Sequence, residues 1–474
     1  MSLTRAIAHN TIVQVVGKVL STAIGLVVIA MLTRYLGEAA FGRYYTIMVY
    51  LQIFGVVVDL GLYIILVKKI SEPNADTAFV ASNIFTLRLV SAVIILGAAP
   101  LIALALPYPS EVRMGIAITT LAFFGITMTQ VLTGLFQKHL KMNRVAIADV
   151  VGKLILLILT WWVVASAGTL LSVMGTVVAG SLATAFMTFI FARRLINIRL
   201  AWDFSFWRQI FSETWPIAIS IFFNMVYFKS DTIILSLTRS DAEVGVYGAS
   251  NRVLEVIVSF PAMFAGLVLP LLAAAWSQMD KERFRAVLQK AYDFLLMLAL
   301  PLIGATLVIA EPVMRIVTGE GYADAGELLR IVTIATGTIF IGNLFGNAVV
   351  AINRQRAMMW LYVLVAVISL AGYLIVIPIF SYFGAAWIRV ASEVMITVAA
   401  LTLVLRSTGT RLSLFTTGKI VCATALMTAT LWVLRGLPLA AVIVVGFVEY
   451  ALLLFAFRTV SKETILDIVK LRST

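Results

Sequence analysis

The sequence is poor in the residues that support chemistry in a soluble protein. It has one cysteine, Cys422, and two histidines, and charged residues make up only 12% of its 474 positions. A single cysteine excludes a disulfide scaffold and a zinc site built on several cysteines. Soluble domains carry about 25% charged residues. Half that share cannot cover the surface of a soluble protein of this size, so an ordinary cytosolic enzyme is excluded.

Nucleotide motifs and large polar loops are also missing. No Gly-x-x-x-x-Gly-Lys-Ser/Thr segment occurs, so the chain has no ATP-binding cassette of its own. The longest predicted outer loop, 311–327, holds four carboxylates but is too short to fold as a catalytic domain. An intramembrane enzyme that uses a carboxylate of this loop stays open as an alternative.

Long apolar runs dominate the chain instead, and hydrophobic residues make up 62% of it. A bilayer core about 30 Å thick takes roughly 20 apolar residues of helix to cross. These runs are too long and too uniform for the alternating strands of a membrane barrel. We therefore predict an all-α polytopic membrane protein with about 14 transmembrane helices. The runs are 11–33, 44–67, 81–106, 112–137, 146–166, 170–191, 214–237, 246–276, 289–310, 328–351, 358–380, 383–405, 417–434 and 438–457.

The distribution of Lys and Arg predicts the orientation. With both termini cytoplasmic, inside segments hold 23 of the 36 basic residues and outside loops hold 6. Basic residues collect on the cytoplasmic side of membrane proteins. The net charge of +13 is therefore a positive-inside signal, and we expect no nucleic-acid partner.

The longest inside connection, 192–213, divides the runs into six before it and eight after it. It carries four arginines together with Trp202 and Trp207. This mixture predicts an amphipathic segment at the membrane interface. A solvated positive-inside loop with interface anchors is the alternative.

A short repeat links the two halves. Residues 38–44 and 241–247 both read acid-Ala-x-apolar-Gly-x-Tyr, at an offset of 203 residues. Each copy lies in a predicted outside loop at the start of a long helix. Equal sidedness predicts a parallel repeat about an axis along the membrane normal, as in transporters built from two bundles.

The same segments carry a family resemblance. Residues 32–37 (Leu-Thr-Arg-Tyr-Leu-Gly) and Phe41-Gly42-x-Tyr44 resemble the first-loop signature of Wzx-type polysaccharide flippases, within the multidrug/oligosaccharidyl-lipid/polysaccharide exporter superfamily. The second half matches in Pro216, residues 231–235, residues 244–249, Glu255 and Pro270-Leu271. The resemblance implies two six-helix lobes, 1–191 and 214–405, in a V around a central cavity. Residues 192–213 then form the linker, and 406–474 form two extra helices and a cytoplasmic tail.

The intramembrane charges are the candidate chemistry, because a charge at a helix centre costs roughly 2.5–3.5 kcal/mol. Lys18 and Arg88 have no acidic residue within one turn of their own helix. Both can serve a diphosphate, whose oxygens need fixed cationic donors. The alternative is structural pairing with Asp59. Lys18 lies on a polar stripe of Gln14, Lys18, Ser21 and Gly25, and the polar neighbours of Arg88 are Asn83, Thr86 and Ser91.

Further candidates lie in the second half. Arg252 is a third candidate for the diphosphate, with a neutralised i, i+3 pair with Glu255 as the alternative. Asn224 and Asp231 are seven residues apart on one helix. The candidates for polar cavity or gating roles are Gln14, Asp59, Asn224, Asp231 and Glu255. Asp231 near the helix end has a simpler alternative, the anchoring of the outer loop.

The resemblance implies a flippase for undecaprenyl-pyrophosphate-linked glycan in the bacterial inner membrane, serving O-antigen, capsule or exopolysaccharide synthesis by alternating access. It implies no enzymatic activity and no cofactor. Because the chain has no nucleotide-binding motif, we expect an H+ or Na+ gradient or the membrane potential to supply the energy for transport. Beyond the glycan and membrane lipid, a glycan polymerase and a chain-length regulator are the expected partners. The alternatives are a multidrug or small-cation exporter of the superfamily and an intramembrane glycan polymerase or ligase.

Overall fold

The computed structural model describes residues 3–59, 61–72, 75–139 and 141–459, so the predicted tail beyond 459 lies outside the described residues. Every regular element of the described part is an α-helix. Within these described residues, eleven helical segments are long and apolar enough to cross a membrane. The prediction of an all-α multi-pass membrane protein is confirmed.

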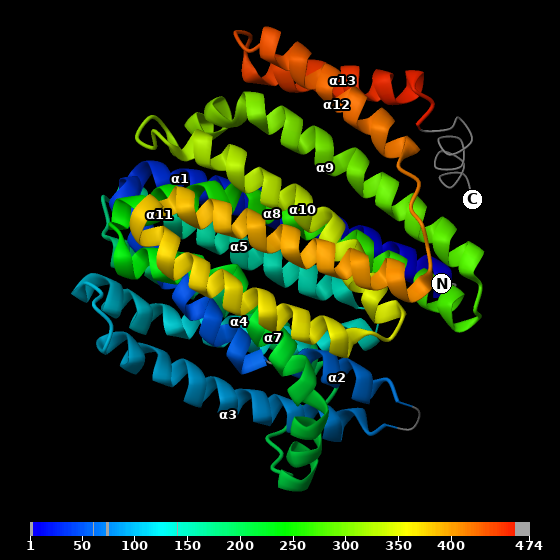
Figure 1. Ribbon diagram of the computed structural model, residues 1–474. Helices are drawn as coiled ribbons and strands as arrows, with labels where there is room; N and C mark the ends of the chain where they lie inside the picture. Colours follow the sequence, from blue (N-terminus) through cyan, green and yellow to red (C-terminus); the bar gives the residue numbers. More distant parts are fainter. Residues whose placement is uncertain (1–2, 60, 73–74, 140, 460–474) are drawn as a thin grey trace. The chain divides into compact units, whose positions relative to one another are not determined.

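The helices follow the predicted apolar runs closely (Figure 1). In chain order they are α1 (Leu3–Asp59), α2 (Leu62–Ile70), α3 (Thr77–Leu104), α4 (Ser110–Lys138), α5 (Met142–Ala165), α6 (Leu170–Arg193), α7 (Phe204–Thr238), α8 (Asp241–Ser277), α9 (Lys281–Thr318), α10 (Ala325–Ala351), α11 (Gln355–Thr408), α12 (Phe415–Val433) and α13 (Leu439–Ala456).

Two helices are about twice the length of one bilayer crossing, and each contains one non-helical residue. In α1, of 57 residues, Gly37 has φ 68°; in α11, of 54 residues, Ser381 has φ 51°. Glycine adopts positive φ without steric cost. Ser381 has no such freedom, but its hydroxyl donates to Glu243 Oε1 at 2.5 Å, which fixes the turn. These breaks fall where the sequence predicts the connections between apolar runs.

The start of α8 is set by local polar residues. Ser240 N donates to Glu243 Oε2 at 2.9 Å, and Glu243 N donates back to Ser240 Oγ at 3.3 Å. This reciprocal arrangement is a capping box, which satisfies amide groups that have no partner inside the helix. It separates α8 from α7 within two residues, and the second copy of the repeat therefore lies in the first turns of α8.

The chain forms two compact units. The first comprises Met1–Gly248 with Tyr373–Ser381, and the second comprises Ala249–Gly372 with Tyr382–Thr474. In the first, buried side chains of α2, α3 and α4 form a core with the start of α7. In the second, α12 and α13 pack together beside α9 (Figure 1). The lobe boundaries predicted from the sequence stay a prediction.

The predicted amphipathic linker is partly helical, because α7 begins at Phe204. Trp207 and Ile210 on one face are buried in the core of the first unit. Phe204, Phe211 and Trp215 on the other face are exposed. Hydrophobic side chains therefore lie on both faces, and the face formed by Trp207 and Ile210 packs against protein. The amphipathic character of the linker stays a prediction.

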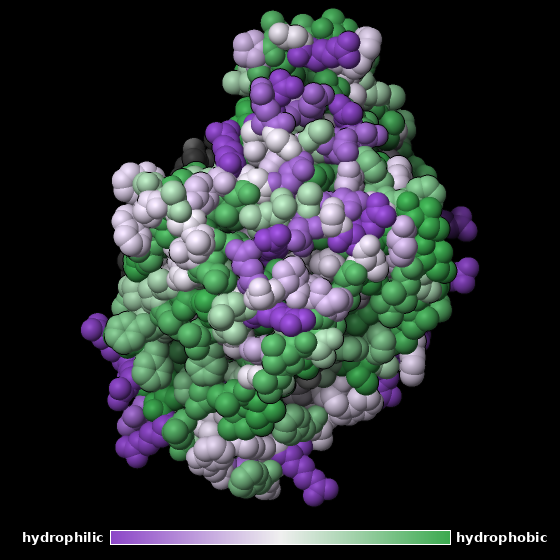
Figure 2. Space-filling model, turned by 90° about the vertical axis from the view of Figure 1, so that its left-hand side faces the viewer, coloured by the Kyte–Doolittle hydropathy of each residue, from purple (hydrophilic) through white to green (hydrophobic). Residues whose placement is uncertain are grey.

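The distribution of polarity suits a protein in a bilayer. Hydrophilic and hydrophobic residues are both exposed on the face that Figure 2 shows. Large hydrophobic side chains are exposed on single helices, among them Trp161 and Trp162 of α5 and Phe447 of α13. Exposed apolar side chains on long helices suit a bilayer, where a helix satisfies its own backbone.

Candidate functional site

Arg88 on α3 has a protein partner for each of its terminal nitrogens. The guanidinium is fully buried and donates to Asp59 on α1, to Gln130 Oε1 on α4 at 2.9 Å and to the carbonyl of Val58 at 3.1 Å. The structure thus gives Arg88 the pairing with Asp59 that the sequence left as the alternative. Gln130 escaped the sequence reasoning, although an amide within the apolar run 112–137 is a signal that could have found it.

The polar neighbours of Arg88 on α3 accept hydrogen bonds from the linker between α6 and α7. The side chains of Ser82, Asn83 and Thr86 accept hydrogen bonds from the backbone N–H groups of residues 199, 203 and 201, at 3.2, 3.0 and 2.9 Å respectively. Buried backbone amides need such partners. Asn83 and Thr86 are therefore committed to fastening the chain between α6 and α7 onto α3, and they do not support a diphosphate site around Arg88.

Lys18 lies on the exposed side of α1. Gln14 and Lys18 are exposed, whereas Ser21 is buried at 4% exposure, so the predicted polar stripe does not share one exposed face. A Cβ on Gly17 would lie 2.7 Å from the Cβ of Ala146 on α5. The side of α1 next to Lys18 that carries Gly17 therefore packs against α5. Within the described residues, no ion pair of Lys18 is found.

In the second unit, α8 and α11 share a polar cluster. Arg252 donates to Glu255 Oε2 at 2.7 Å, the i, i+3 pair that the sequence offered as the alternative to substrate binding. The adjacent Asn251 accepts from Arg389 of α11 at 2.6 Å, and both side chains are buried. An anionic ligand of Arg252 would therefore compete with Glu255.

On α7, Asp231 and Asn224 each form a hydrogen bond with a tyrosine of the first unit. Asp231 is 1% exposed and accepts from the hydroxyl of Tyr247 on α8 at 2.5 Å. Asn224 donates to the hydroxyl of Tyr227 at 3.1 Å. Asp231 therefore ties the end of α7 to the start of α8, which agrees with its anchoring alternative.

The two copies of the sequence repeat touch each other with a pseudo-twofold pattern. A Cβ on Gly42 would lie 1.7 Å from the carbonyl oxygen of Asp241, and a Cβ on Gly245 would lie 2.0 Å from that of Glu38. The offset of 203 residues relates both pairs, since it carries Gly42 to Gly245 and Glu38 to Asp241. Only glycine permits this approach of backbone to backbone.

Arg43 fastens this contact from one side. Its Nε donates to Asp241 Oδ2 and its Nη1 to Glu111 Oε2, both at 2.7 Å, so that α1, α4 and α8 are joined. Residue 246, the counterpart of Arg43 in the second copy, is valine. In the sequence, Arg43 is one of the basic residues of the predicted outside loops. Its partner Asp241 lies in the second copy of the repeat, but nothing in the sequence pointed to its partner Glu111.

Comparison with known families covers most of the chain. Residues 7–276 match the polysaccharide biosynthesis protein family, and residues 216–375 match MatE. A protein of Shigella dysenteriae that is provisionally named an O-antigen transporter is 24% identical over 267 residues. That alignment covers 53% of this chain and 63% of the relative, so the chain matches less than two thirds of that protein.

Solved structures share the fold. A lipid II flippase, MurJ, in an inward closed conformation gives a TM-score of 0.77 at 13% identity, over 94% of this chain and 99% of that one. An inward-facing multidrug-resistance transporter of the MATE family gives 0.66 at 14% identity, over 83% and 96% of the two chains. A eukaryotic MATE transporter, AtDTX14, gives 0.62 at 13% identity, over 85% and 95%.

Proposed function

Because the chain belongs to the polysaccharide biosynthesis protein family, we propose that it moves an undecaprenyl-pyrophosphate-linked oligosaccharide across the bacterial inner membrane by alternating access. The family match over residues 7–276 carries the proposal. The relative named as an O-antigen transporter and the fold shared with a lipid II flippase support a lipid-linked glycan as cargo. The glycan would serve O-antigen, capsule or exopolysaccharide synthesis, with a polymerase and a chain-length regulator as partners.

The membrane topology in this proposal has fourteen crossings. The breaks at Gly37 and Ser381 divide α1 and α11 into two crossings each, with α2 completing the second half of α1. Crossings one to six and seven to twelve make two lobes, and α12 and α13 are the extra pair. Both termini are cytoplasmic, as the positive-inside signal favours.

Lys18 is the residue we assign to the diphosphate of the cargo. Asp59 is engaged by Arg88 and Glu255 by Arg252, whereas Lys18 is exposed within the apolar run 11–33. An ammonium left in hydrocarbon costs roughly 2.5–3.5 kcal/mol, so a polar cavity is its favoured surrounding. Gln14, one turn earlier on the same side, supplies a further polar group. An H+ or Na+ gradient or the membrane potential supplies the energy.

The contact between the repeats acts as the outer closure in this mechanism. Gly42 and Gly245 bring α1 and α8 together on the predicted outer side, and Arg43 holds them through Asp241. Release of cargo outward then requires these backbones to separate. The side chain of Arg43 is 34% exposed, so solvent screens its two ion pairs and they can break repeatedly. Fully exposed pairs contribute about 1 kcal/mol or less.

The test is surface glycan in a bacterial strain whose own flippase is deleted and replaced by this chain. Lys18→Ala should abolish display and leave the lipid-linked precursor in the inner leaflet, with Lys18→Arg retaining part of it. Lys419→Ala, on α12, is the matched control. Normal display by Lys18→Ala at normal protein level overturns the assignment of Lys18, and no display by the wild type with any cognate precursor overturns the function.

A drug exporter is the second candidate, because residues 216–375 match MatE. A cationic drug favours a carboxylate in the first crossing, whereas the apolar run 11–33 carries Lys18. Drug-susceptibility measurements in the same strain separate the two functions. Resistance to cationic drugs without glycan display would select the exporter.

A further inference from the structure

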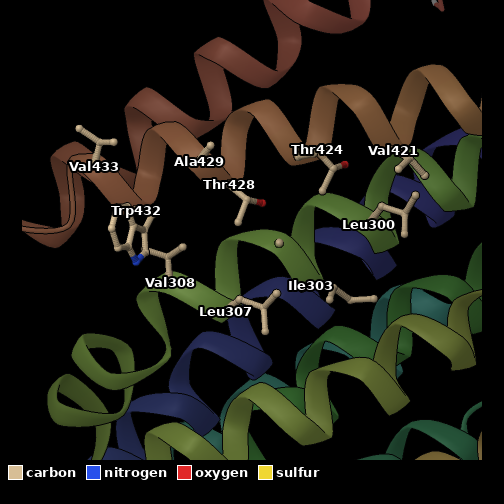
Figure 3. A pocket seen from close by; sticks show the side chains of 12 residues that line it. Leu300, Ile303, Leu307, Val308, Val421, Thr424, Thr428, Ala429, Trp432 and Val433 are labelled. Atoms are coloured by element: carbon tan, nitrogen blue, oxygen red, sulfur yellow. The ribbon is translucent and has the colours of Figure 1, made fainter.

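A hydrophobic groove lies between α9 and α12 in the second unit. It has a volume of about 740 Å³ and is lined by two helical stripes. Figure 3 shows Thr424 and Thr428 pointing from α12 toward α9, with Trp432 beside Val308 at one end. The lining residues are Leu300, Ile303, Gly304, Leu307 and Val308 of α9 and Val421, Thr424, Ala425, Thr428, Ala429, Trp432 and Val433 of α12.

The groove is open to the surroundings along its length. Leu307, Val421 and Trp432 are 46%, 49% and 59% exposed although they line it. On a helix pair that crosses the membrane, these surroundings are hydrocarbon. Apart from two threonine hydroxyls and the indole N–H, every lining side chain is apolar. The occupant is therefore a hydrocarbon chain.

The groove has the length of one leaflet. Residues 421 to 433 rise about 18 Å along α12 at 1.5 Å per residue. Half of the hydrocarbon core of a bilayer is about 15 Å thick. A single lipid chain reaching from the middle of the bilayer to one interface fits this span, whereas a chain crossing both leaflets does not.

Arg435 lies beside Trp432, at the end of the groove nearest the turn between α12 and α13. The guanidinium of Arg435 lies 4.9 Å from the centre of the Trp432 ring, in the turn between α12 and α13. Arg435 is exposed, and no ion pair for it occurs among the residues that the structure describes. Guanidinium groups bind phosphate oxygens through directed hydrogen bonds, and tryptophan favours the headgroup level of membranes.

We propose that the α9/α12 groove binds one acyl chain of a membrane glycerophospholipid, with its phosphate at Arg435. The inference goes beyond the proposed function and does not depend on the cargo. The lipid completes the packing of the C-terminal pair, since α12 meets α9 through Met427, Leu431 and Ile309 on the adjacent side.

The experiment uses the purified, delipidated full chain in detergent, with palmitoyl-oleoyl phosphatidylglycerol as the probe. Its midpoint of thermal unfolding should rise saturably with the lipid. Arg435→Gln should weaken the apparent affinity about tenfold, the loss of one charge-assisted hydrogen bond. Ala425→Trp, at an exposed groove residue, should remove the effect by filling the space. Leu426→Trp, exposed on α12 but outside the lining, should keep it.

Two results overturn the proposal. One is equal lipid stabilisation in the wild type and Ala425→Trp, which would place the lipid elsewhere. The other is stabilisation by undecaprenyl phosphate but not by the phospholipid, which would make the groove a seat for the cargo chain. Neither outcome requires glycan display, so a failure here is distinct from a failure of the proposed flippase function.

Discussion

The carboxylate of Asp59 on α1 accepts a hydrogen bond from the fully buried guanidinium of Arg88 on α3. With Gln130 and the carbonyl of Val58, it turns an intramembrane arginine into a tie between α1, α3 and α4. This ion pair neutralises the charge of Arg88 within the first unit. Once Asp59 serves Arg88, Lys18 stays exposed on α1, and no ion pair of Lys18 is found among the described residues.

Removing one partner of this pair should destabilise the protein. Arg88→Met leaves a partly buried carboxylate without its cation, and we expect a loss of about 3 kcal/mol in the free energy of unfolding. Thermal unfolding in detergent measures it. The double variant Arg88→Met, Asp59→Asn should recover part of the loss, because no uncompensated charge remains. Unchanged stability of Arg88→Met with selective loss of glycan display would instead restore Arg88 as a cargo residue.

The repeat contact should not tolerate a methyl group. Gly42→Ala or Gly245→Ala places a Cβ within about 2 Å of a carbonyl oxygen, so the two backbones must separate. We expect lost glycan display at normal protein level. In a Cys422→Ala background, a cysteine introduced by Ala40→Cys should also react faster with a membrane-impermeant maleimide. Gly97→Ala is the matched control, because no atom lies within 4 Å of its Cβ position.

The linker between α6 and α7 should exchange its amide hydrogens faster when its hydrogen-bond acceptor on α3 is removed. Asn83→Ala leaves the amide of residue 203 without its partner, which costs about 1–3 kcal/mol for a buried group. Hydrogen exchange of residues 197–203 should accelerate. Ser91→Ala on the same helix should not have this effect, because its hydroxyl donates to the carbonyl of Leu87 within α3. Equal exchange in both variants would contradict the role of Asn83.

Glu213 should make stability depend on acid pH. A hydrogen bond from Lys69, with a second from Lys68, lowers the pKa of Glu213 from 4.5 to about 2. Because the folded pKa lies below the unfolded one, the contribution is present above pH 4.5 and is lost as pH falls toward 2. Glu213→Gln should therefore lower the unfolding temperature at pH 7 and have a smaller effect at pH 3. Glu282→Gln, an exposed carboxylate of α9, is the control, and a difference from wild type that stays constant with pH would refute the pairing.

The sequence by itself determined the class and the helices of this protein. Scarce charge and apolar runs of about 20 residues leave helices as the structures that can satisfy their backbone in lipid. It also located the repeat, because Gly42 and Gly245 recur at one offset with the same neighbours. The partners were decided only by the tertiary structure. Arg88 and Lys18 look alike along the chain, but helix packing brings Asp59 and Gln130 to one and leaves the other exposed. Pairing between helices depends on how each helix is rotated about its axis, and periodicity within one helix does not fix that rotation.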